Sequence, residues 1–146
     1  GDPKKVLIVF PIDEPSFRVA CYTFRDLGKK SGQKMNFIVL VKEQFKDLFH
    51  LQIGNSMYIN HSNNDTIVAE EKLLLQSLKQ NKFDIIVDLN PTFQLAISRF
   101  ISLLNSEMKV GFVSDFSDRF YNIQLDISKS GIMEKGFKQI NWILAQ

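Results

Sequence analysis

The chain has 146 residues, of which 45% are hydrophobic and 23% charged, with 18 lysines and arginines against 16 acidic residues and a net charge of +2. So many apolar residues exclude a disordered chain, and the interspersed charges exclude a basic stripe, so no nucleic-acid partner is expected. The longest purely apolar runs, 6–10 and 37–41, are far shorter than the roughly 18 residues of a membrane span, and we expect a soluble, cytoplasmic protein without one.

The first third of the chain predicts a strand, a helix and a second strand. Residues 5–10 (KVLIVF) contain a continuous apolar run after Lys5, which is typical of a strand buried on both faces. Apolar residues then recur at helical spacing from Phe17 to Leu27, with Ser16 as the expected N-cap. A second apolar run, 35–41 (MNFIVLV), predicts the next strand, and a short helical pattern follows it.

The middle of the chain predicts a weak strand over 57–59, then a helix, then a strongly apolar strand over 83–89 (FDIIVDL). Asn90 followed by Pro91 is a typical helix start, because asparagine caps and proline suits the first helical position. We therefore expect a helix directly after the strand, with the apolar stripe that runs from Phe93 to Leu104 facing the core.

The last third predicts two more strands, over 108–113 (MKVGFV) and 121–125, and a terminal helix. At helical spacing Met133, Phe137, Ile140 and Leu144 share one face, so Trp142 should point outward. The alternation of strands and helices predicts a single α/β, Rossmann-like domain over residues 1–146. We expect three layers: a mostly parallel sheet of five to six strands with helices on both faces.

The candidate functional residues follow the strands, because ligands of open parallel sheets bind beyond the carboxyl ends of the strands. Asp13, beside Glu14, is a candidate general base at the start of the first helix, and a solvated acidic turn is the alternative interpretation. Asp88 suits a ligand contact, or a structural carboxylate that accepts backbone N–H groups. Asn90 suits a helix cap. Arg119 could bind an anion, and an ion pair with a nearby aspartate explains it equally well.

Several kinds of site are excluded or disfavoured by the sequence. The first loop, 10–16, contains no glycine, so it cannot form a dinucleotide-binding turn, and the chain has no P-loop pattern. One cysteine and two distant histidines do not make a metal-ligand cluster, so we expect no metal and no cofactor. Cys21 is expected to be a packed thiol rather than a nucleophile, and His50 and His61 are expected at the surface.

Four segments together resemble the first half of heptosyltransferase-type glycosyltransferases, which form family 9 and have the GT-B fold: 5–10, 83–104, 108–126 and 132–144. That family has a strand of the form Y/F-D-x-V/I-I-D, a helix and a V-G-F strand, with an arginine and a tyrosine shortly after. Here 83–89, 110–112, Arg119 and Tyr121 match this order. The resemblance covers nearly the whole chain.

The resemblance implies the acceptor-side domain of an enzyme that transfers a sugar from a sugar nucleotide, such as ADP-heptose, to a saccharide acceptor in lipopolysaccharide synthesis. The family opens its first helix with a Gly-Asp pair whose aspartate is the presumed base. An ungapped count from the first strand places that pair on Pro15 and Ser16, and a shifted alignment gives the role to Asp13. The site residues implied are Asp13 as base, with ligand contacts from Ser16, Asp88, Asn90 and Arg119.

The donor site of such enzymes lies mainly in a second domain, so the chain is expected to be incomplete for catalysis alone. It is either an excised transferase half or a stand-alone relative that has lost transfer chemistry. The alternative function is a non-catalytic Rossmann-like binding or assembly module of unknown ligand. In either case the exposed end of the terminal helix, near Trp142, suits a second domain or a homodimer contact.

Overall fold

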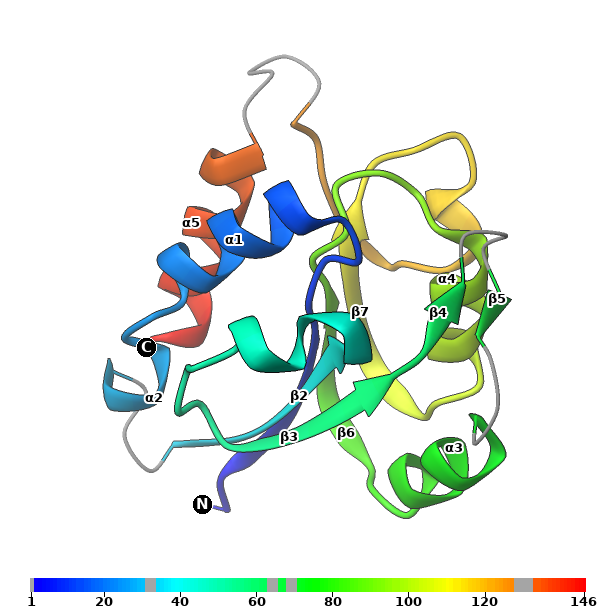
Figure 1. Cartoon of the computed structure of the whole chain (residues 1–146), viewed down its shortest axis with the longest axis horizontal. Helices are drawn as coiled ribbons and strands as arrows, with labels where there is room; N and C mark the ends of the chain where they lie inside the picture. Colours follow the sequence, from blue (N-terminus) through cyan, green and yellow to red (C-terminus); the bar gives the residue numbers. More distant parts are fainter. Residues whose placement is uncertain (1, 31–33, 63–65, 68–70, 128–132) are drawn as a thin grey trace.

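The computed structural model describes residues 2–30, 34–62, 66–67, 71–127 and 133–146 (Figure 1). Six strands form one sheet in the order β3-β2-β1-β6-β7-β8, and every neighbouring pair in it is parallel. The strands are β1 (Lys4–Val9), β2 (Met35–Lys42), β3 (Asn55–Ile59), β6 (Phe83–Asp88), β7 (Ser106–Phe112) and β8 (Ile123–Leu125). Two short strands, β4 (His61–Ser62) and β5 (Thr66–Ile67), form a separate antiparallel pair. The α/β prediction is confirmed.

The two central strands explain why the sequence shows continuous apolar runs. β1 is paired with β2 on one side and β6 on the other, and its side chains alternate between two cores. Val6 and Ile8 belong to one core, while Leu7 and Val9 belong to the other. A strand covered on both faces needs apolar residues at every position. β6 likewise lies between β1 and β7, so both apolar runs form interior strands of the sheet.

Helices cover both faces of the sheet, as Figure 1 shows, with α1 and α5 on one side and α3 and α4 on the other. The longer helices are α1 (Glu14–Thr23), α3 (Glu71–Lys79), α4 (Leu95–Ser102) and α5 (Met133–Leu144). Three shorter helical segments are α2 (Leu27–Lys30), η1 (Glu43–Leu48) and η2 (Ser117–Arg119). No helix in the described residues is both long enough and apolar enough to cross a membrane.

The starts of two helices differ from the prediction. The N-cap of α1 is Asp13 rather than Ser16: its Oδ2 accepts a hydrogen bond from the Ser16 backbone N–H at 3.0 Å, and Ser16 is buried within the helix. Helix α4 begins at Leu95, behind Gln94, and not at Asn90. The side chain of Asn90 is engaged in the tertiary hydrogen bonds described below, so it cannot cap a helix.

The phase of the terminal helix is as predicted. Phe137, Ile140 and Leu144 are buried, whereas Trp142 is 68% exposed and Ile143 is 53% exposed. Helices α1 and α5 pack against each other, with Phe24 and Phe137 at a ring-centroid distance of 6.3 Å. The prediction for His61 is wrong, since this residue lies in β4 and is buried.

Candidate functional site

The candidate site lies where the carboxyl ends of β1 and β6 meet. The connections after these neighbouring strands lead to opposite faces of the sheet: β1 is followed by α1 on one face, and β6 is followed by α4 on the other. The loops after them therefore diverge, which creates the position where open α/β sheets bind ligands. Asp88 ends β6 directly opposite Val9 of β1.

Asp88 is the centre of a buried polar network. Its Oδ1 accepts hydrogen bonds from the backbone N–H of Asn90 at 2.9 Å and from Asn90 Nδ2 at 2.8 Å. Its Oδ2 accepts a short hydrogen bond from the hydroxyl of Tyr121, which also contacts Ser98 Oγ at 2.8 Å. Asp88 is only 4% exposed, so this carboxylate is satisfied by protein groups rather than by water.

Burial sets the ionisation of this network. It raises the pKa of the Asp88 carboxyl, while the hydrogen bonds from Tyr121 and Asn90 oppose the rise. Burial and the neighbouring Asp88 also raise the pKa of the Tyr121 phenol, which stays protonated and able to donate. The structural role considered for Asp88 is therefore observed, since its carboxylate accepts the backbone N–H of Asn90.

Asn90 connects this network to the loop that carries Asp13. Its Oδ1 accepts a hydrogen bond from the backbone N–H of Ile12 at 2.9 Å. Proline has no N–H, so Ile12 supplies the one amide donor between Phe10 and Asp13. The carbonyl of Ile12 accepts from Lys42 Nζ at 3.4 Å, so the segment just after β6 and the end of β2 both hold this loop.

Asp13 has an exposed carboxylate at this edge of the sheet. As the N-cap of α1 it lies at the positive end of the helix, and Glu14 beside it pairs with Arg18 at 3.6 Å. The predicted ligand residues are distributed differently: Asp88 and Asn90 are buried beneath the loop, and Ser16 is buried in α1. Of the two aspartates predicted as site residues, Asp13 and Asp88, Asp13 is therefore the one whose side chain is open to a ligand.

Arg119 is exposed in η2, and it forms neither of the ion pairs considered from sequence. Within the described residues no carboxylate lies within 4.0 Å of its guanidinium, and Asp118 instead accepts a hydrogen bond from Gln124 Nε2 at 2.7 Å. Arg119 thus offers a free cation close to the end of β7. Nothing in the sequence indicated that Asp118 would accept a hydrogen bond from Gln124 instead of pairing with Arg119.

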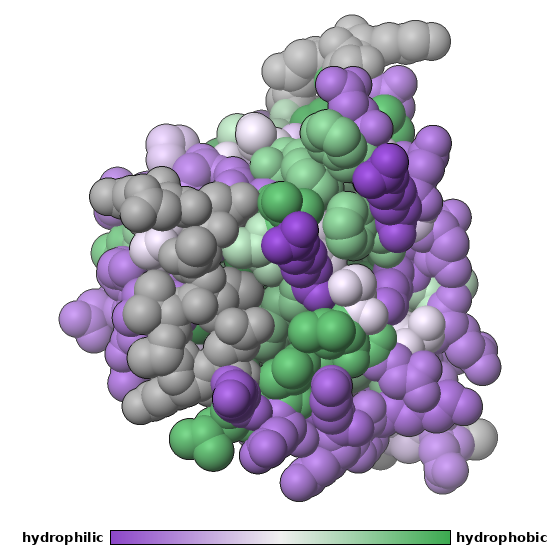
Figure 2. Space-filling view, turned by 90° about the vertical axis from the view of Figure 1, so that its right-hand side faces the viewer, coloured by the Kyte–Doolittle hydropathy of each residue, from purple (hydrophilic) through white to green (hydrophobic). Residues whose placement is uncertain are grey.

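Three aromatic rings pack together at the loop that carries Arg119, and this cluster was not predicted from the sequence. Phe93 lies 5.5 Å from Phe116 and 5.7 Å from Phe120, measured between ring centroids, and Phe116 is 51% exposed. Figure 2 looks onto the side of α3 and α4 and shows hydrophobic areas bordered by hydrophilic side chains. The spacing of these three phenylalanines along the chain carries no signal, since they come from two separate loops.

The structure gives a physical reason for the glycine of the V-G-F motif, Gly111. A Cβ atom at this position in β7 would lie 2.7 Å from the ring of Tyr121, closer than real side-chain contacts allow. The glycine of the V-G-F strand therefore makes room for the tyrosine that donates to Asp88.

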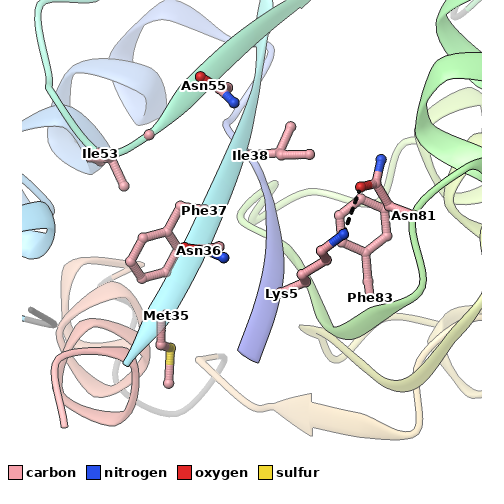
Figure 3. Close-up of a pocket in the computed structure, with 10 residues that line it drawn as sticks. Lys5, Met35, Asn36, Phe37, Ile38, Ile53, Asn55, Asn81 and Phe83 are labelled. Carbon is pink, nitrogen blue, oxygen red and sulfur yellow. Dashed lines mark hydrogen bonds between the residues drawn. The ribbon is translucent and has the colours of Figure 1, made fainter. Parts of the chain in front are cut away.

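A separate hollow of about 360 Å³ lies at the opposite edge of the sheet, by the amino ends of β1, β2 and β6 (Figure 3). Lys5 Nζ donates to Asn81 Oδ1 there at 3.2 Å, and Met35, Phe37 and Phe83 add apolar lining. Because open α/β sheets bind ligands at the carboxyl ends, we place the candidate site at Asp13 and not in this hollow.

Two other kinds of chemistry find no support in the described part of the chain. It contains no group of three or more histidine, cysteine, aspartate or glutamate residues that could hold a metal ion. Cys21 is half-buried against the core, and burial raises the pKa of its thiol to about 11. The thiol is therefore protonated at neutral pH and is a poor nucleophile, as expected.

Comparison with known proteins identifies similar folds. No family model and no curated protein matches the sequence. A family 9 glycosyl transferase from Veillonella parvula matches 99% of this chain with a TM-score of 0.74 at 11% identity, and the match covers 42% of that protein. Escherichia coli heptosyltransferase WaaC, solved with ADP, matches 94% of this chain with a TM-score of 0.64 at 16% identity, over 46% of its own length. The same enzyme with ADP-2-deoxy-2-fluoro heptose matches at 0.64 and 15% identity, over 47%.

The chain thus spans less than half the length of each of these structures. The resemblance found in the sequence is confirmed for the fold, and the chain has the α/β architecture of part of a family 9 glycosyltransferase.

Proposed function

We propose that this chain is the acceptor-side domain of a family 9-like glycosyltransferase and is incomplete for catalysis alone. The observation that carries the proposal is the match of 99% of this chain to 42% of a family 9 glycosyl transferase. The exposed carboxylate of Asp13, at the edge where such sheets bind ligands, supports it chemically. WaaC was solved with ADP and with an ADP-sugar analogue, so a sugar nucleotide is the donor class to test.

In the proposed reaction Asp13 is the general base. The acceptor hydroxyl attacks the anomeric carbon of the sugar nucleotide, a carbon–oxygen bond forms, and the bond from that carbon to the diphosphate breaks. Asp13 takes the hydroxyl proton, and the nucleoside diphosphate leaves with the electron pair. The free guanidinium of Arg119 suits a contact to an anionic group of either substrate.

Binding measurements on the isolated chain test the proposal. Titration with oligosaccharides of the lipopolysaccharide core, followed by amide NMR, should shift signals in the loops 10–16, 90–94 and 114–120. The variants Asp13→Asn and Arg119→Ala should alter those shifts. Calorimetric titration with ADP- and UDP-sugars should show no tight binding, because the donor half is expected elsewhere. A dissociation constant near micromolar, about −8 kcal/mol, would contradict incompleteness. Oligosaccharide shifts confined to the hollow of Figure 3 would contradict the placement of the site.

The alternative, a non-catalytic binding or assembly module, is favoured by one feature. Ile143 lines an apolar hollow of about 260 Å³ between α5 and the strands β6, β7 and β8, and both Ile143 and the adjacent Trp142 are exposed. Tryptophan is enriched at contact centres. We therefore also propose a homodimer through this end of α5, which sedimentation of the wild-type chain would detect.

A further inference from the structure

We propose that Asp88 is a positioning residue: acting through Asn90, it fixes the backbone of Ile12 and so the place from which Asp13 faces the ligand. The inference rests on the proposed role of Asp13. Its test needs no enzymatic activity, because the positioning is a property of the loop itself.

Asp88 sets the orientation of the Asn90 amide. Its Nδ2 donates to Asp88 Oδ1 at 2.8 Å, which leaves its own Oδ1 to accept from Ile12 N at 2.9 Å. With the amide turned over, Nδ2 would face the N–H of Ile12 and Oδ1 would face the carboxylate. Both contacts would then be repulsive. Asp88 therefore determines which end of Asn90 the loop meets.

The hydrogen bond to Asn90 holds the loop before Asp13. The N–H of Phe10 is used by the carbonyl of Leu40 at 2.9 Å, Pro11 has none, and the N–H of Ile12 goes to Asn90. The next residue is Asp13, whose side chain starts α1 by accepting from Ser16. The hydrogen bond from Ile12 N–H to Asn90, in the segment that follows β6, is thus the last backbone hydrogen bond to that segment before the candidate base.

The Asp88 carboxylate is buried, and hydrogen bonds from Tyr121 and Asn90 hold both of its oxygens. It does not reach the exposed edge where Asp13 lies. Asp88 therefore acts on the loop of Asp13 through Asn90, which is what distinguishes a positioning residue from a catalytic one.

Amide hydrogen exchange on the 146-residue chain, measured by NMR, tests the proposal. Asp88→Ala should speed exchange at the Ile12 amide at least about fivefold, the factor that an ordinary hydrogen bond contributes. The acceleration should be independent of added denaturant, as for local opening, while the amides of Leu7 and Val9 in β1 stay protected. Asp88→Asn should restore protection at Ile12, since its side-chain oxygen still accepts from Asn90 and its amide can donate to Tyr121.

Asp84 provides a matched control on the same strand. Its carboxylate accepts from the backbone N–H of Lys5 at 2.8 Å, at the other end of β1. Asp84→Ala should speed exchange at Lys5 and leave Ile12 unchanged. If the Asp88→Ala chain is unfolded, Asp88→Leu combined with Tyr121→Phe gives the same comparison, because it removes the acceptor of the Asn90 amide, keeps the apolar packing and leaves no Tyr121 hydroxyl facing an apolar side chain.

Three results would overturn the proposal. These are an unchanged Ile12 amide, equal acceleration at Ile12, Leu7 and Val9, and a failure of Asp88→Asn to restore protection. The second result would mean that Asp88 contributes only global stability. A selective loss of exchange protection at the Ile12 amide supports the positioning role of Asp88 whether or not a saccharide binds. An absence of saccharide binding with the loop intact would count against the proposed function alone.

Discussion

Replacing Tyr121 with phenylalanine removes one buried hydroxyl and leaves the aromatic ring. That hydroxyl donates to the Asp88 carboxylate and contacts Ser98 Oγ at 2.8 Å, both of them buried. A hydrogen bond to a charged group contributes about 1.5–3 kcal/mol, and its loss leaves a buried oxygen of Asp88 without a partner. The ring keeps its packing, so the apolar contribution is nearly unchanged. We expect Tyr121→Phe to lower the free energy of unfolding by about 2–3 kcal/mol.

Equilibrium unfolding in urea measures this loss, with Tyr58→Phe as the control. Tyr58 is half-buried in β3, and its hydroxyl has no hydrogen bond in the described part of the chain, so this change should stay within about 0.5 kcal/mol. A loss for Tyr121→Phe no larger than that of the control would refute the reasoning. It would mean that the hydroxyl contributes nothing to the Asp88 network.

Three further changes have definite expected outcomes. Trp142→Ala should leave the stability of the monomer within about 0.5 kcal/mol, because the side chain is 68% exposed, while weakening any dimer seen by sedimentation; a loss of several kcal/mol in the monomer would refute the exposed position. Gly111→Ala should cost about 1–3 kcal/mol in urea unfolding, because its Cβ would press on the Tyr121 ring, and a neutral result would contradict that contact. Burial raises the pKa of Asp88 in the folded state, so its contribution to stability is full below about pH 4 and is lost as the pH rises through the folded pKa. Wild type should therefore lose stability relative to Asp88→Asn as the pH rises above about 4, and a constant difference would show that the pKa is not raised.

The strands and the phase of the last helix were predictable because buried positions are apolar, and their spacing along the sequence follows the period of the strand or helix. A strand segment covered on both faces, such as Val6–Val9 of β1, is apolar at every position, and α5 has an apolar stripe that already places Trp142 outside. These signals are local. They depend on which face of an element meets the core, not on which partner it meets.

The missed helix starts have a different cause. Asn90 is a good capping residue by type, but the distant Asp88 network and Ile12 use its amide, so α4 starts at Leu95. For α1 the sequence did contain the better signal: Pro15 suits the first turn of a helix, which favours Asp13 over Ser16 as the cap.

The candidate site was only partly predictable, because its contacts join distant parts of the chain. Asp88 and Tyr121 are 33 residues apart, and Asn90 is 78 residues from Ile12. Sequence position could indicate that Asp13 and Asp88 follow strands. It could not indicate that one carboxylate would be exposed and the other buried beneath it.

The pairing of β1 with β6 also has a consequence for how the chain folds. Lys5 and Asp84, which hydrogen-bond across this pair, are 79 residues apart, so the centre of the sheet closes only after a long loop has been ordered. Until β6 arrives, β1 has one open edge made of Val6, Leu7 and Ile8, which is apolar on both faces. Such an edge is a template for pairing with other chains. A fragment that ends before Phe83 should therefore aggregate, whereas the full chain, in which β6 covers this edge and β7 and β8 follow, should not.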